Sequence, residues 1–206
     1  MSVIIGIINN GKVILACDTL LSNKLDISMR KNGQNKIFDF ELDEIRYLIG
    51  MTGKMEDILQ FQTILSKHLF SKLSYSSLDF ANELHSIIKI NNINHLNILL
   101  GCNTMNTPYI FKIGIDSFEH INQEFGYNML LPNSCSSKNK QIDEILQMNS
   151  HLLLKNNGLD LLRLAIREVG IIDKFRFVND DFYYKILDET NQIIKPPKSD
   201  KGYYIK

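Results

Sequence analysis

Ser2 is the residue whose type and position most directly indicate chemistry. It follows Met1 in a chain of 206 residues, and a small second residue favours removal of the initiator methionine, which would give Ser2 a free α-amino group. An α-amine has a pKa of roughly 7.7 to 8.0, so part of it is unprotonated at neutral pH and can act as a general base. Ser2 would then supply both a nucleophilic hydroxyl and the base that activates it.

The partner of Ser2 across the sheet depends on how the first two strands are connected. Two β-branched runs flank a polar segment at 9–11, whose Asn and Gly residues tolerate positive φ, and this pattern predicts a hairpin. A two-residue turn would place Ser2 opposite Thr19, whereas a three-residue loop would place it opposite Asp18. We expect the three-residue loop, and with it the Asp18 carboxylate beside the amino terminus.

The elements that must position these residues follow from hydrophobic periodicity. Runs rich in β-branched and aromatic residues predict strands at 2–8, 12–19, 36–40, 45–51, 96–102, 109–115, 118–121, 182–187 and 192–194. Apolar residues at three- and four-residue spacing predict helices at 54–71, 77–90, 137–153 and 159–169. Ser77 is the expected N-cap of the second helix, and Gly170 is the expected left-handed residue that ends the fourth.

The order of these elements predicts an α+β fold. Strands are followed by two helices, more strands, two more helices and a final pair of strands, which suits two antiparallel sheets between two helix layers, a four-layer αββα sandwich. A doubly wound sheet would need strict alternation of strand and helix. We expect one domain over 1–194 and a polar C-terminal tail over 195–206.

Composition excludes several classes of partner. Lys plus Arg and Asp plus Glu both number 23, so no global charge would attract nucleic acid or an anionic membrane. No apolar run reaches the roughly 18 residues of a membrane span. Three widely spaced cysteines favour reduced thiols and a cytoplasmic location. The five histidines do not fall at metal-ligand spacings, and we expect neither a metal nor a cofactor.

Four segments carry a resemblance to a known family. The opening at 2–7, followed by Val-Ile-Leu-Ala-Cys-Asp-Thr at 13–19, is similar to the nucleophile strand and the A-A-D-T/S signature of proteasome-type N-terminal nucleophile (Ntn) hydrolases. Residues 36–38 resemble the family's lysine strand, and residues 49–53 resemble its oxyanion segment. Residues 96–113 resemble its central strand pair. The similarity spans most of residues 2–188, and the family's αββα sandwich has the element order predicted above.

The resemblance implies a role for each of four residues. Ser2 would be the nucleophile, and Asp18 would orient Lys36. The ammonium group of Lys36 would lower the pKa values of the Ser2 amine and hydroxyl and stabilise negative charge. Gly53, which has no Cβ to block a scissile carbonyl, would donate its backbone N–H to the oxyanion.

The resemblance extends to residues that would support the site or bind substrate. Asp173 and Ser134 would support the nucleophile, whereas Leu21 and Met51 would border a pocket for an apolar or neutral substrate side chain. The chain departs from the family after Asp173, because residues 174–177 read Lys-Phe-Arg-Phe where the family has a serine and a pair of glycines.

The function that the resemblance implies is hydrolysis of a peptide or other amide bond through an acyl ester on Ser2. The substrate would be a peptide or protein, and the chain would form a homo-oligomeric ring or stacked ring; the sequence does not identify an ATP-dependent unfoldase partner. Two alternatives stay open. One is a catalytically inactive structural or assembly protein, which the departure at 174–177 favours. The other is an Ntn acylase or transpeptidase that acts on another amide.

Each candidate also has a purely structural interpretation. Asp18 could form a turn at a strand end, and Lys36 could be a solvated residue of an edge strand. Asp173 could simply follow a helix, and Ser134 could be an ordinary loop serine.

Overall fold

The protein is described by a computed structural model that covers residues 3–20, 36–68, 76–104, 107–131, 138–174, 178, 181–190 and 192–194. Its strands form two five-stranded sheets, with the orders β10-β9-β2-β1-β8 and β3-β4-β5-β6-β7. All neighbouring strands are antiparallel. The strands are β1 (Ile4–Asn9), β2 (Lys12–Asp18), β3 (Ile37–Leu42), β4 (Ile45–Thr52), β5 (Asn97–Thr104), β6 (Thr107–Gly114), β7 (Phe118–Ile121), β8 (Tyr127–Leu130), β9 (Phe182–Leu187) and β10 (Ile193–Ile194).

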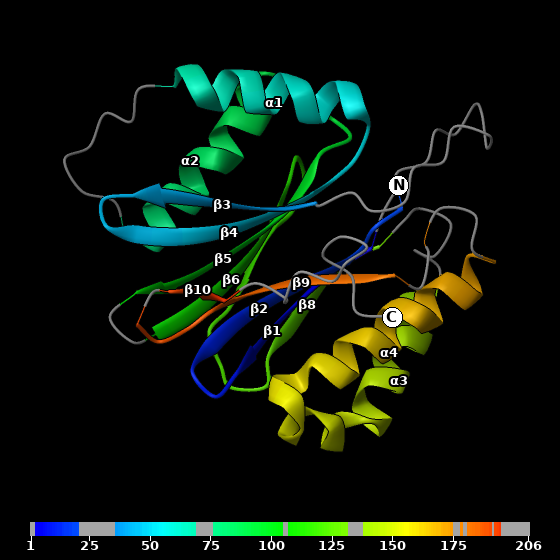
Figure 1. Cartoon of the computed structure of the whole chain (residues 1–206). Coiled ribbons are helices and arrows are strands. Elements are labelled where there is room, and N and C mark those ends of the chain that lie inside the picture. Colours follow the sequence, from blue (N-terminus) through cyan, green and yellow to red (C-terminus); the bar gives the residue numbers. More distant parts are fainter. Residues whose placement is uncertain are drawn as a thin grey trace, which may run out of the picture.

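Helices cover the outer face of each sheet. Helices α1 (Met55–Lys67) and α2 (Ser77–Ile90) lie on the sheet that contains β3 and β4, whereas α3 (Asn139–Met148) and α4 (Leu159–Ile172) lie on the sheet that contains β1 and β2 (Figure 1). Two short 3₁₀ helices, η3 (Ser150–Leu154) and η4 (Asn156–Gly158), connect α3 to α4. The αββα sandwich predicted from the sequence is therefore confirmed.

Three apolar layers hold the four structural layers together. Because successive side chains of a strand point to opposite faces, β1 directs Ile5 and Ile7 toward α3 and α4, and Ile4 and Ile8 toward the second sheet. A separate cluster fills the space between the second sheet and α1 and α2. Both sheets are thus buried on both faces near their centres, which explains the nearly continuous apolar runs of the first two strands.

The first hairpin differs from the expected one. Asn9 pairs with Lys12 and Ile4 pairs with Cys17, so the turn contains two residues, Asn10 and Gly11, rather than three. Both turn residues have positive φ, 52° and 68°, as in the type I′ turn whose twist matches that of paired strands. The prediction of a three-residue loop, and of Ser2 opposite Asp18, is therefore wrong.

Two helix ends also differ from the sequence predictions. Gly170 does not end α4, because the helix continues to Ile172, whose side chain packs on the same core as Ile166. The left-handed residue is instead Lys174, with φ of 54°. The N-cap of α2 is Ser76 rather than Ser77, and its hydroxyl accepts the Asp79 amide N–H.

The third predicted helix is shorter than 137–153, and one strand was not predicted. Helix α3 ends at Met148, and Asn149 is its C-cap: the backbone N–H and the side-chain amide of Asn149 both donate to the carbonyl of Ile145. Strand β8 pairs with β1 at the edge of the first sheet. It has only four residues, and its short sequence gave no clear alternation.

Candidate active site

Asp18 is the centre of a buried polar cluster at the end of β2. Its Oδ1 accepts the backbone N–H of Val3 at 3.0 Å, and its Oδ2 accepts the backbone N–H of Leu20 at 3.1 Å. The side chain is fully buried. The observed register therefore still places Asp18 beside the start of β1, although its partner is Val3 rather than Ser2.

Lys36 completes this cluster from the other sheet. It immediately precedes β3, and its Nζ lies 2.8 Å from Asp18 Oδ2 and 2.7 Å from the carbonyl oxygen of Leu20. The Lys36 residue is 7% exposed. Two of the three N–H donors of the ammonium group thus have acceptors, Asp18 Oδ2 and the Leu20 carbonyl oxygen. The ion pair links the end of β2 in one sheet to the start of β3 in the other.

Burial dominates the electrostatics of this pair. It raises the pKa of Asp18 above its ordinary value, while the Lys36 charge and the N–H groups of Val3 and Leu20 oppose the rise. Removing one partner of a buried ion pair lowers the stability of the protein strongly, because the remaining charge stays buried without hydration and without a counter-charge. Asp18 and Lys36 thus fix each other in position.

Ser2 itself lies outside the described residues, as do Leu21 and Ser134. The described chain begins at Val3, whose backbone contacts Asp18 through both its N–H and its carbonyl; the latter accepts the Asp18 amide at 3.4 Å. The role of Ser2 as nucleophile therefore stays a prediction.

Gly53 lies between β4 and α1, as the sequence predicted, but the structure gives another reason for glycine. A Cβ at this position would lie 2.0 Å from the carbonyl oxygen of His95, so any side chain would collide with backbone. The φ of 152° is also one that other residues rarely adopt. Glycine is required here by the packing of the protein itself, and not only by the space that a substrate would need.

Met51 and Asp173 are both buried, in different parts of the fold. Met51 belongs to the apolar layer between the second sheet and α1 and α2. Asp173 is the C-cap of α4, and its backbone N–H donates to the carbonyl of Val169. A substrate-binding role for Met51 and a supporting role for Asp173 remain predictions.

Two polar contacts between the sheets were not found by sequence reasoning. The Leu20 carbonyl is a backbone acceptor that no side-chain pattern reveals. Lys185 of β9 is 3% exposed and forms an ion pair with Asp39 of β3, a second link between the sheets. A lysine inside a strand of apolar and aromatic residues, Phe-Tyr-Tyr-Lys-Ile-Leu, was the signal that could have indicated it.

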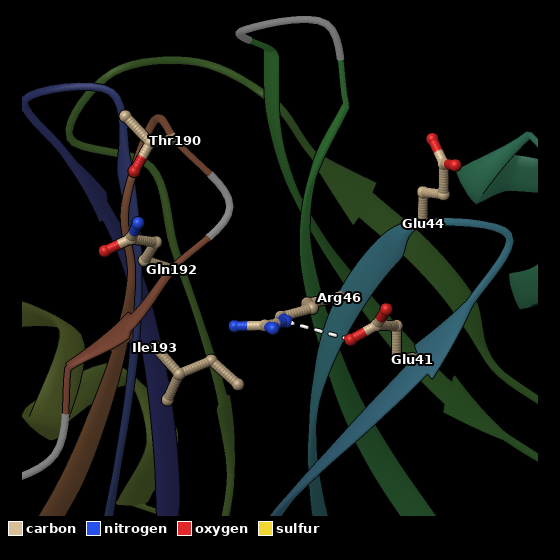
Figure 2. A pocket seen from close by; sticks show the side chains of 6 residues that line it. All are labelled: Glu41, Glu44, Arg46, Thr190, Gln192 and Ile193. Carbon is tan, nitrogen blue, oxygen red and sulfur yellow. Dashed lines mark hydrogen bonds and ion pairs between the residues drawn. The ribbon is translucent and has the colours of Figure 1, made fainter.

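A polar pocket lies at the opposite end of β3 from Lys36. It is lined by both sheets, with Arg46 of β4 pointing toward Gln192 and Ile193 (Figure 2). Arg46 also forms an ion pair with Glu41, with Nε and Oε2 3.0 Å apart. This pocket shares no residue with the Asp18–Lys36 cluster. Within the described ranges, no group of His, Cys, Asp and Glu could hold a metal ion, and no helix is long and apolar enough to cross a membrane.

Comparison with known proteins supports the fold. No protein-family model matches the chain, and no curated protein does. Among solved structures, an Anbu (Gly-1) mutant from Hyphomicrobium sp. strain MC1 superposes with a TM-score of 0.70 at 12% identity, covering 95% of this chain and 86% of that one. Anbu, described as an ancestral beta-subunit, from Yersinia bercovieri gives 0.68 at 12% identity, covering 94% and 86%.

A eukaryotic HslV from Trypanosoma brucei gives a TM-score of 0.62 at 16% identity, covering 90% of this chain and 99% of that one. Similarity at this level of identity establishes fold and leaves activity open. The chain therefore has the αββα fold of the proteasome-like Ntn hydrolases Anbu and HslV, which confirms the resemblance found in its sequence.

Proposed function

We propose that the protein is an amide-bond hydrolase that uses Ser2, freed by removal of Met1, as its nucleophile. The observation that carries the proposal is the buried Asp18, which binds the Val3 backbone through one oxygen and the Lys36 ammonium through the other. This arrangement supports a fixed positive charge beside the residue that precedes Val3. A solvated turn or edge-strand role for Asp18 and Lys36 would not require such burial.

The proposed reaction has two stages. The α-amine of Ser2 accepts the proton of the Ser2 hydroxyl as Oγ attacks the scissile carbonyl, and the negative charge on the carbonyl oxygen is stabilised by the Gly53 N–H. The tetrahedral intermediate then collapses, the leaving amine takes the proton, and an acyl ester remains on Ser2. Water, activated by the same α-amine, attacks the ester and releases the acid. Lys36 favours the neutral amine by charge repulsion.

The proposed substrate is a peptide or protein, with Leu21 and Met51 bordering the pocket for an apolar or neutral side chain. We further propose that Asp173 and Ser134 support the nucleophile and that the protein is a cytoplasmic homo-oligomeric ring or stacked ring. Solved proteins of the same fold include one described as an ancestral beta-subunit, which supports an assembled state.

Substrate profiling tests the proposal. Wild type should cleave fluorogenic peptides with an apolar or neutral residue before the scissile bond, and Ser2→Ala should not. Cleavage of small acyl amides in preference to peptides would indicate an acylase instead. Absence of cleavage of either class would favour an inactive structural homologue, a reading that the Lys-Phe-Arg-Phe sequence at 174–177 supports.

A further inference from the structure

Asp57 connects the start of helix α1 to the loop before β5. It lies in the first turn of α1, and its Oδ2 accepts the backbone N–H of His95 at 2.8 Å. The two residues are 38 positions apart in the chain. Helix α1 therefore holds this loop through a charge-assisted hydrogen bond, which is stronger than a bond between neutral groups.

The same loop packs directly on Gly53. The place where a Cβ of Gly53 would project is filled by His95, whose carbonyl oxygen is 2.0 Å and carbonyl carbon 3.0 Å from that point, and by the Cα of Leu96 at 3.2 Å. The peptide group after His95 thus forms the wall against which Gly53 rests. Asp57 accepts the N–H of His95, and the carbonyl group of the same residue packs on Gly53.

We infer that Asp57 is a positioning residue for Gly53. It holds His95 by its amide, the His95 carbonyl packs on Gly53, and this contact fixes the position of Gly53, whose N–H is the proposed oxyanion donor. The inference rests on the proposed function, in which the Gly53 N–H binds the oxyanion. An oxyanion donor must lie about 2.7 to 3.1 Å from the oxygen, and misplacement by about 1 Å can reduce the rate about a hundredfold.

Glu56 provides a matched control. It is also a carboxylate in the first turn of α1, so both residues stabilise the positive end of the helix dipole to a similar extent. Replacing either one by alanine removes the same charge from the same turn, but only Asp57→Ala removes the acceptor that holds His95. Asp57→Asn tests rescue, because it keeps an amide oxygen that can accept the His95 N–H.

The decisive measurement compares two covalent probes on the full chain. A β-lactone acylates the nucleophile through an oxyanion intermediate, whereas a peptide vinyl sulfone reacts at a vinyl carbon and forms no oxyanion at a carbonyl. Asp57→Ala should slow the β-lactone by about ten- to a hundredfold and change the vinyl sulfone rate by less than about twofold. Asp57→Asn and Glu56→Ala should react with both probes much as wild type does. Equal slowing of both probes in Asp57→Ala, or β-lactone rates equal to those of Glu56→Ala, would overturn the inference.

Hydrogen exchange measured by mass spectrometry gives a readout that does not need activity. The amide of His95, which loses its acceptor, should exchange faster in Asp57→Ala than in wild type or Glu56→Ala. If wild type reacts with neither probe, the proposed function fails, and the exchange of His95 still decides whether Asp57 holds the loop that packs on Gly53. Unchanged exchange at His95 in Asp57→Ala would refute the inference by itself.

Discussion

Lys36 and Asp18 form a buried ion pair, and the proposed function assigns the same pair a role in activating Ser2. Their side chains are 8% and 0% exposed, and each neutralises a charge that the fold has removed from water. Lys36→Met should therefore lower the free energy of unfolding by about 3 to 5 kcal/mol, because the Asp18 carboxylate would stay buried without a cation. It should also slow acylation by a β-lactone by about a hundredfold or more.

A double variant separates the two roles. In Lys36→Met/Asp18→Asn no charge is left unpaired, so urea unfolding should show a smaller loss of stability than in Lys36→Met alone. Acylation should remain as slow as in the single variant. A double variant that regains normal acylation would mean that the pair is only structural.

The buried thiols of Cys17 and Cys102 should be inert. Burial raises the pKa of Cys17 from 9.0 to about 12, and that of Cys102 likewise to about 12. A raised pKa lowers the thiolate fraction at a given pH, here by about a thousandfold at pH 8, and the thiolate is the reactive form. In a protein that carries Cys135→Ser, native-state alkylation by iodoacetamide at pH 8 should be at least about a hundredfold slower than that of free cysteine. Labelling at a rate near that of free cysteine would contradict the structure.

At the scale of elements, two ion pairs link the edge strand β3 to the first sheet. The β3 side contributes the cation to one pair and the anion to the other. Lys36, just before the strand, binds Asp18, and Asp39 within it binds Lys185. The Lys185 side chain is 4% exposed and that of Asp39 is 39% exposed. Among the described strands β3 pairs with β4 alone, so these ion pairs help to fix where Lys36 lies relative to Asp18.

The cost of losing the Asp39–Lys185 pair should depend on which partner is removed. Asp39→Ala leaves Lys185 charged and buried, and should lower the free energy of unfolding by about 3 kcal/mol. Lys185→Met should cost less, because water can reach the Asp39 carboxylate. Glu41→Ala is the control from the same strand: its pair with Arg46 is 58% and 43% exposed and should contribute about 1 kcal/mol or less. Equal losses for Asp39→Ala and Glu41→Ala in urea unfolding would refute this account.

Most elements of the fold could be predicted from the sequence, because long apolar runs such as those of β1 and β2 leave little choice of structure. The errors concern short segments, in which the sequence is compatible with more than one local structure. The turn at Asn10 and Gly11 was misjudged because two-residue and three-residue loops use the same residue types, and the sequence of β8, Tyr-Asn-Met-Leu, shows no clear alternation of apolar and polar residues. The Asp18–Lys36 pair could be predicted from a motif, whereas the contact of His95 with Gly53 could not, since it joins backbone atoms distant in the chain.

At the scale of the whole molecule, the proposed assembly gives a direct prediction. A chain of 23.8 kDa that forms a ring should elute from size exclusion with light scattering at a multiple of that mass. The mass should not fall in Ser2→Ala, because assembly does not depend on the nucleophile. A single species at the mass of one chain, independent of concentration, would contradict the proposed ring.

The central claim is that Ser2 is a free N-terminal nucleophile, and intact-mass spectrometry tests it most directly. The purified protein would be weighed before and after treatment with a β-lactone or epoxyketone probe, beside Ser2→Ala as control. The account predicts a mass that lacks Met1 and gains one probe adduct, with no adduct on Ser2→Ala. A retained Met1, or a processed chain that never gains the adduct, would contradict it.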